Sequence, residues 1–170
     1  MDAATWGFVG TVVGAVVGAS ASILTTLISE RNSARLQNNA DTLERLERAR
    51  EFQRNNLLEI QDSLAKNMRL VGRAHLEDVE SYRKDGSEGR SNFLSEELDQ
   101  ELMLSSRKLA ILTERIADDA LRNNLKELRQ KMTDVLMAKS EIESSEILQI
   151  VSTGFEQFMQ QLGVVLRNNY

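Results

Sequence analysis

The feature that most constrains this chain is a run without any charged residue, from residue 3 to residue 29. Asp2 is the only charged residue before the run, and Glu30 and Arg31 close it. As an α-helix rising about 1.5 Å per residue, the run would extend roughly 40 Å, longer than the bilayer's hydrocarbon core of about 30 Å. The sequence therefore predicts a transmembrane helix over residues 1–29.

Two other interpretations of this run stay open at the level of sequence. A cleaved signal peptide normally begins with basic residues, whereas this chain begins Met1-Asp2, although residues 19–21 (Ala-Ser-Ala) imitate a cleavage site. A buried helix of a soluble protein normally shows a polar face. Val, Ile, Leu and Phe residues are instead distributed around the whole helix. The transmembrane interpretation is favoured over both.

Small residues recur at four-residue steps within the predicted span, at Gly10, Gly14, Gly18 and Ser22. Such glycine-zipper spacing lets a second helix approach closely, so that dispersion and Cα–H···O contacts accumulate. The pattern favours a homo-oligomer, either a dimer or a ring. The simpler alternative is a single anchor that happens to be rich in small residues.

The residues at the two ends of the run predict its orientation. Arg31 and Arg35 follow the span closely, while no basic side chain precedes it, and basic residues are retained on the cytoplasmic side. Trp6 lies at the opposite end, where an indole ring is suited to the headgroup region. We therefore expect a single-pass protein of the inner (cytoplasmic) membrane, with the N-terminus outside and the C-terminal region in the cytoplasm.

Composition predicts an all-α fold for the rest of the chain. The sequence has no proline, only 5% aromatic residues and 28% charged residues, and strong helix formers dominate. Charge is uneven, because residues 30–56 carry a net charge of +1 and residues 57–170 carry −5. A net-acidic body lacks the basic surface that binds nucleic acid, so we expect no nucleic-acid partner.

Residues 30–56 are expected to form an Arg-rich juxtamembrane stalk helix that continues from the span. Leu36, Leu43 and Leu46 are its main apolar residues, and their spacing indicates a short coiled-coil seam. The arginines suit contact with anionic membrane lipid. They are equally explained by the need to set topology and to keep a bare stalk soluble.

Residues 57–170 are expected to form a cytoplasmic antiparallel bundle of about four helices, with one loop at 85–92. Apolar residues recur at three- and four-residue steps over 57–84, 93–117, 118–139 and from 140 onward. Asp118 is a predicted N-cap, and Ser140 and Glu143 have the spacing of a capping box. The short junctions near 117 and 139 suit hairpins, although kinks in one longer helix fit the sequence too.

Residue types that carry chemistry are scarce. His75 is the only histidine and cysteine is absent, so neither a catalytic triad nor a ligand set for a metal is evident. Gly86-x-x-Gly89 is too short for a phosphate-binding loop and lacks its Lys. We therefore expect no enzyme, no cofactor and no metal, and His75 is best explained as a packing residue.

The N-terminal third resembles bacterial and phage-encoded single-span membrane proteins, a resemblance that implies no activity and no functional residues. It is carried by Trp6, Gly10, Gly14, Gly18, Arg31, Arg35 and the segment 44–51. The sequence predicts a membrane-anchored, non-catalytic helical interaction or scaffold protein that binds a protein partner of unknown identity. Two alternatives are a membrane-perturbing effector of the toxin or phage-defence type, and an accessory subunit of a larger membrane complex.

Overall fold

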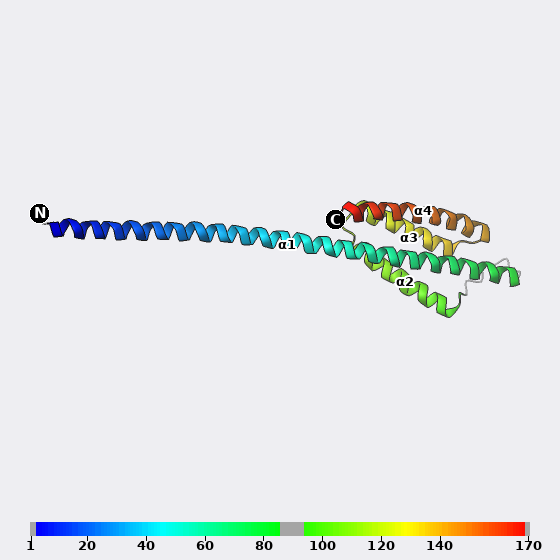
Figure 1. Ribbon diagram of the computed structural model, residues 1–170. Helices are drawn as coiled ribbons and strands as arrows, with labels where there is room; N and C mark the ends of the chain where they lie inside the picture. Colours follow the sequence, from blue (N-terminus) through cyan, green and yellow to red (C-terminus); the bar gives the residue numbers. More distant parts are fainter. Residues whose placement is uncertain (1–2, 86–93, 169–170) are drawn as a thin grey trace. The chain divides into compact units, whose positions relative to one another are not determined.

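The computed structural model describes the backbone of residues 3–85 and 94–168, and the side chains of residues 7–81 and 94–168. These residues form four α-helices and no strand: α1 Ala3–Asp85, α2 Glu96–Glu114, α3 Asp119–Met137 and α4 Glu141–Asn168 (Figure 1). The prediction of an all-α chain is confirmed. The loop predicted at 85–92 lies outside the described residues, except for Asp85, which ends α1.

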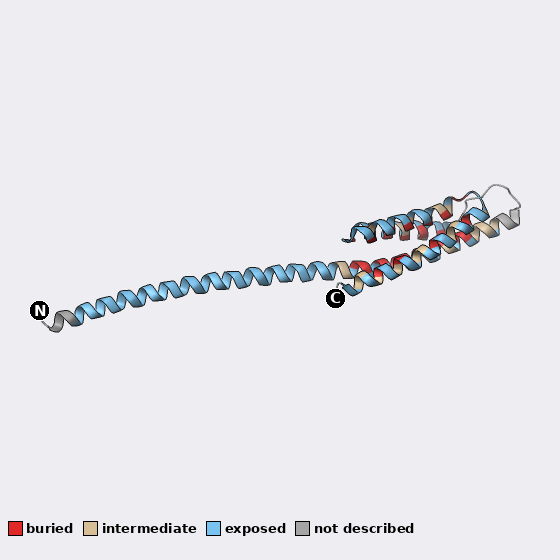
Figure 2. Cartoon of the chain, turned by 90° about the horizontal axis from the view of Figure 1, so that it is seen from above, coloured by how far each residue is buried: buried red, intermediate tan, exposed pale blue. Residues whose placement is uncertain are grey.

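The chain divides into two compact units, residues 1–49 and residues 50–170. The first unit is the N-terminal part of α1, in which every side chain described, from residue 7 to residue 49, is exposed (Figure 2). The α1 helix is unbroken from Ala3 to Asp85, and no proline interrupts it. The apolar run and the Arg-rich segment therefore belong to one helix.

The core of the second unit is built from the apolar stripes that the sequence shows. In α3 the five apolar residues that recur at three- and four-residue steps are all buried, and this spacing places them on one side of the helix. They are Leu121, Leu125, Leu128, Met132 and Val135. The α1 segment buries a wider face than predicted, which includes the polar residues Asn56, Ser63 and Asn67. The largest fully buried apolar side chains are Leu57, Ile60, Leu64, Val71, Leu98, Leu109, Ile116, Leu125, Val135, Val151 and Leu162.

Two hydrogen bonds give the relative direction of α1 and α2, because positions further along α1 pair with positions earlier in α2. The amide of Gln53 donates to the carbonyl oxygen of Arg115 at 3.0 Å. Further along α1, the amide of Asn67 donates to the hydroxyl of Ser106 at 3.0 Å. The two helices therefore run in opposite directions, and the buried amide of Asn67 is satisfied by a partner on α2.

Helices α3 and α4 form a hairpin, and they lie side by side in Figure 1. Asn124 near the start of α3 donates to Gln161 near the end of α4 at 2.8 Å. At the other end, the hydroxyl of Ser144 donates to the carbonyl oxygen of Val135 at 3.1 Å. The junction near 139 is thus a chain reversal, and not a kink in a longer helix.

The start of α2 differs from the prediction. Helix α2 begins at Glu96 and ends at Glu114, whereas the apolar pattern predicted a helix from about Phe93 to Ala117. Leu94 and Ser95 are not helical, and acidic residues occupy the first turn after Ser95, where they interact favourably with the helix dipole. The apolar pattern includes Leu94 because this side chain packs against the core from outside the helix.

The start of α4 is a modified capping box. The hydroxyl of Ser140 accepts from the backbone N–H of Glu143 at 3.2 Å, as predicted. The carboxylate of Glu143 accepts from the backbone N–H of Lys139 at 2.8 Å, one residue before the position that a standard capping box uses. The backbone N–H groups of Lys139 and Glu143 therefore both have a side-chain acceptor.

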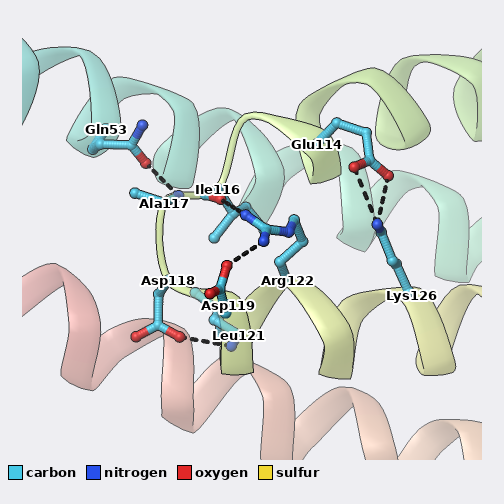
Figure 3. Close-up of polar contacts among 9 residues, drawn as sticks. All are labelled: Gln53, Glu114, Ile116, Ala117, Asp118, Asp119, Leu121, Arg122 and Lys126. Atoms are coloured by element: carbon cyan, nitrogen blue, oxygen red, sulfur yellow. Dashed lines mark hydrogen bonds and ion pairs between the residues drawn. The ribbon is translucent and has the colours of Figure 1, made fainter.

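Removing the N-cap of α3 should destabilise the second unit. The carboxylate of Asp118 accepts from the backbone N–H of Leu121 at 2.8 Å (Figure 3). We expect Asp118→Ala to lower the free energy of unfolding by about 1 kcal/mol, because a backbone donor loses its partner. Asp119→Ala removes a neighbouring carboxylate that pairs only with Arg122 at the surface, and should cost less than about 0.5 kcal/mol. Urea unfolding followed by circular dichroism measures both, and equal losses would contradict the capping role.

Two helical glycines should respond in opposite ways to substitution by alanine. A Cβ atom at Gly72 in α1 would meet nothing within 4 Å, whereas one at Gly154 in α4 would lie 3.2 Å from Cδ1 of Leu128. Gly72→Ala should therefore stabilise the unit by about 0.5–1 kcal/mol through helix propensity alone. For Gly154→Ala we expect a smaller gain or a net loss, because Leu128 must move. The same unfolding measurement compares them, and an equal gain at both sites would show that Leu128 yields freely.

Candidate membrane span and helix-association surface

The N-terminal part of α1 exposes apolar side chains along the described part of its apolar run, from residue 7 onward. Val13 is 56% exposed, Ile23 62% and Leu24 60%. Among the described residues, one helix is long and apolar enough to cross a membrane by length and composition, and its apolar window is not buried by the rest of the chain. A core helix of a soluble protein would be covered, so this exposed apolar helix is a candidate membrane span.

The helix fixes the direction in which each small residue of the span points. Four residues correspond to about 400° of an α-helix, so each four-residue step advances by about 40°. The series from Gly10 through Gly14 and Gly18 to Ser22 therefore winds through about 120° around the helix. The residues that stay within about 40° of Gly18 form what we call the small-residue line, and they are Gly7, Thr11, Gly14, Gly18, Ser22, Thr25 and Ser29.

The small-residue line is an open surface within one chain. A Cβ atom built at Gly7, Gly10, Gly14 or Gly18 would meet nothing within 4 Å. None of these glycines is therefore needed for contacts among the described residues. Backbone strain does not explain them either, because all four lie inside a regular helix. Their missing side chains leave room for the close approach of another helix.

Four hydroxyl groups of the span are satisfied by the helix itself. Each of the four donates to the backbone carbonyl oxygen four residues earlier, at 2.8–3.0 Å. This bonding pattern lets a hydroxyl reside in hydrocarbon without water or a second helix as its partner. The groups are Thr11, Ser20, Thr25 and Thr26.

The small-residue line continues into the stalk as an apolar line. At 100° per residue, Leu36 and Leu43 fall within about 20° of Gly18 around the helix, and Asn32 and Ala40 lie beside them. Leu36 is 70% exposed and Leu43 is 61% exposed. Leu36 and Leu43 of the predicted coiled-coil seam therefore share one face of α1 with the small residues of the span, whereas Leu46 lies about 80° around the helix from Gly18. Sequence inspection by four-residue steps missed Thr11, Thr25 and Ser29, which a 3.6-residue period identifies.

The predicted interface anchors lie at the two ends of the apolar run. Arg31 and Arg35 are exposed and one helical turn apart, directly after the run. Trp6 belongs to α1 by its backbone, but its side chain lies outside the described residues. The arginines are thus free to contact anionic headgroups, which is what their predicted role requires.

His75 is a packing residue of the second unit. Its Nδ1 lies 2.8 Å from the hydroxyl of Ser144, which in turn donates to the carbonyl oxygen of Val135. The hydroxyl of Ser144 thus joins the imidazole of His75 to the backbone at Val135 inside the core. The described residues contain no group of three His, Cys, Asp or Glu that could hold a metal ion.

No protein-family model, curated protein or solved structure matches this chain. Its function is therefore inferred from its own surfaces: the exposed apolar helix, the face shared by span and stalk, and the folded helical unit.

Proposed function

We propose that this chain is a membrane-anchored, non-catalytic interaction protein that self-associates through its span and stalk. The observation that carries this proposal is the uncovered apolar length of α1, which continues without a break into a stalk and a folded helical unit. A bilayer provides the cover that this apolar surface needs. The protein then spans the inner (cytoplasmic) membrane once, with its N-terminus outside.

Self-association follows from the shared face of span and stalk. In the membrane, two helices gain little from apolar burial alone, and close packing of small residues supplies the attraction. Outside the membrane, Leu36, Leu43 and Leu46 gain from removal of their apolar surface from water. A parallel association places the small-residue line against its copy, and Leu36 and Leu43 against theirs, in a single register.

The second unit is proposed to be an antiparallel four-helix bundle in the cytoplasm that contacts a protein partner. The order of hydrogen bonds along α1 and α2, and along α3 and α4, supports this arrangement. Large apolar side chains remain on its surface, among them Ile142 at 73% and Met137 at 69% exposure. These side chains offer apolar contacts to a partner.

An anchor is favoured over a membrane leak by the bonding of the hydroxyl groups. A water-filled pore gains from polar side chains that are free to bind water. In this span the hydroxyls of Thr11, Ser20 and Thr25 already donate to carbonyl oxygens of their own helix. Following membrane potential after induction tests this choice, because depolarisation would favour the leak.

Cysteine labelling tests the membrane topology, since the chain contains no cysteine of its own. We expect an impermeant maleimide to label Ala3→Cys in intact cells, and Ser152→Cys, an exposed position of α4, only after permeabilisation. Alkaline carbonate should leave both variants in the membrane fraction. Release of the protein by carbonate would overturn the anchor, and the opposite labelling pattern would reverse the orientation. Co-purification in mild detergent identifies any stoichiometric partner.

A further inference from the structure

A polar cavity lies where α1, α2 and α3 meet in the second unit. Its volume is about 320 Å³, within the range of small-ligand sites. Asn67 of α1 and Ser106 of α2 contribute to one part of its lining. Lys126, Arg129 and Thr133 of α3 contribute to another. Two cations, several neutral polar side chains and the carboxylate of Glu114 therefore border one space.

Arg129 is the residue in this cavity whose charge is not balanced by contact. Its side chain is partly buried, and burial lowers the pKa of its guanidinium. Among the described residues, it donates no side-chain hydrogen bond and has no carboxylate within ion-pair distance. The negative charge of Glu114 raises the pKa of Arg129, but it does so from beyond ion-pair distance. Partial removal of a cation from water without a counter-ion is unfavourable, and a bound anion would relieve that cost.

Lys126, the other cation of the cavity, already has a partner. Its ammonium lies 2.9 Å and 3.1 Å from the two carboxylate oxygens of Glu114 (Figure 3). The hydrogen bond from Lys126 lowers the pKa of Glu114, so this carboxylate stays ionised at neutral pH. Both residues are exposed enough to move, with side chains 44% and 62% exposed. Lys126 can therefore turn toward an anion at Arg129, whereas Glu114 opposes the entry of one.

Ser106 supplies a neutral donor directed by the core. Its hydroxyl oxygen accepts from the amide of Asn67 at 3.0 Å, and Asn67 is only 3% exposed. Because the oxygen accepts from Asn67, the hydroxyl proton is available to another acceptor. Ser106 therefore keeps a hydroxyl donor at the lining of the same cavity that Arg129 borders.

We propose that this cavity binds the phosphate group of a phosphate monoester, with Arg129 as its principal ligand and Ser106 and Lys126 as further donors. A phosphate group presents three oxygens to such a set, and the planar guanidinium matches two of them at once. The cavity leaves room beyond the phosphate for a small organic group. The ligand is either a soluble phosphate ester or a lipid headgroup. The proposal is independent of the membrane anchor and of self-association.

Titration of the full chain in a zwitterionic detergent with glycerol 1-phosphate tests the proposal, with calorimetry as the readout. Binding should saturate, and Arg129→Gln should weaken it about tenfold or more. Lys131→Gln is the matched control, because it removes one positive charge from an exposed position of the same helix, outside this cavity. It should change the dissociation constant by less than about twofold.

Glu114→Gln gives a result of the opposite sign. It removes the carboxylate that holds Lys126, so binding should become about threefold to tenfold tighter. This variant also leaves Arg129 intact, which keeps the test valid if Arg129→Gln unfolds. Absence of saturable binding, equal weakening by Arg129→Gln and Lys131→Gln, or weaker binding by Glu114→Gln would each overturn the proposal.

Comparison with phosphatidic acid in mixed micelles distinguishes the two sources of phosphate. If the acylated compound binds more than about tenfold tighter and still depends on Arg129, the natural ligand is a lipid. Equal affinities identify a soluble phosphate ester. Either outcome supports the phosphate site, provided that Arg129→Gln weakens the binding. Binding of phosphatidic acid that is insensitive to Arg129→Gln, with no binding of glycerol 1-phosphate, contradicts it.

Discussion

Leu64→Ala should lower the free energy of unfolding of residues 50–170 by about 2–5 kcal/mol. Leu64 is completely buried, in the α1 segment that packs against the other helices of this unit. The substitution loses the transfer free energy of the removed carbons and leaves a cavity that the rigid neighbours fill only in part. A helical unit of this size has a total stability of roughly 5–15 kcal/mol, so the loss is a large part of it.

Leu76→Ala is the matched control for this prediction. Leu76 lies in the same helix, twelve positions after Leu64, and its side chain is 62% exposed. The same substitution there should change stability by less than about 0.5 kcal/mol, because alanine is a better helix former and little surface leaves the core. Urea unfolding of the full chain in detergent, followed by helical circular dichroism, compares the two. Similar losses would show that α1 does not pack in this unit as described.

The apolar core was largely predictable from periodicity, whereas its polar members were not. Leu121, Leu125, Leu128, Met132 and Val135 were identified from sequence because one helix face is read directly from a 3.6-residue period. Asn67 and Ser144 are also buried. A polar residue is buried only when a partner on another helix satisfies it, and that partner is not visible in the local sequence.

The candidate surfaces were predictable to different degrees. The span and its flanking arginines follow from charge alone, and Gly14, Gly18 and Ser22 follow from spacing. Leu36 and Leu43 share a face with these residues only because α1 continues unbroken from the span into the stalk. The cavity at Arg129 could not be predicted from local sequence, because Asn67, Ser106 and Arg129 come from three helices distant in the chain.

Gly14→Leu should weaken self-association of the full chain in detergent micelles about tenfold or more, equivalent to about 1.4 kcal/mol. A leucine side chain on the small-residue line would hold two helices apart and remove their close contacts. Within one chain the substitution meets no obstacle, because even a Cβ at Gly14 would have nothing within 4 Å. Leucine is also a better helix former than glycine. A loss of association would therefore originate between molecules.

Val13→Leu is the control that separates the small-residue line from the rest of the span. Val13 lies in the same turn on the opposite side of the helix and is 56% exposed. Val13→Leu should change the dissociation constant of self-association by less than about twofold, because the larger side chain there faces lipid. Energy transfer between labelled copies, diluted with increasing detergent, measures both variants against the unchanged chain. If Gly14→Leu associates as tightly as Val13→Leu, the glycines do not form the contact. Any oligomer would then be held by Leu36, Leu43 and Leu46 of the stalk, which Leu43→Ala tests directly.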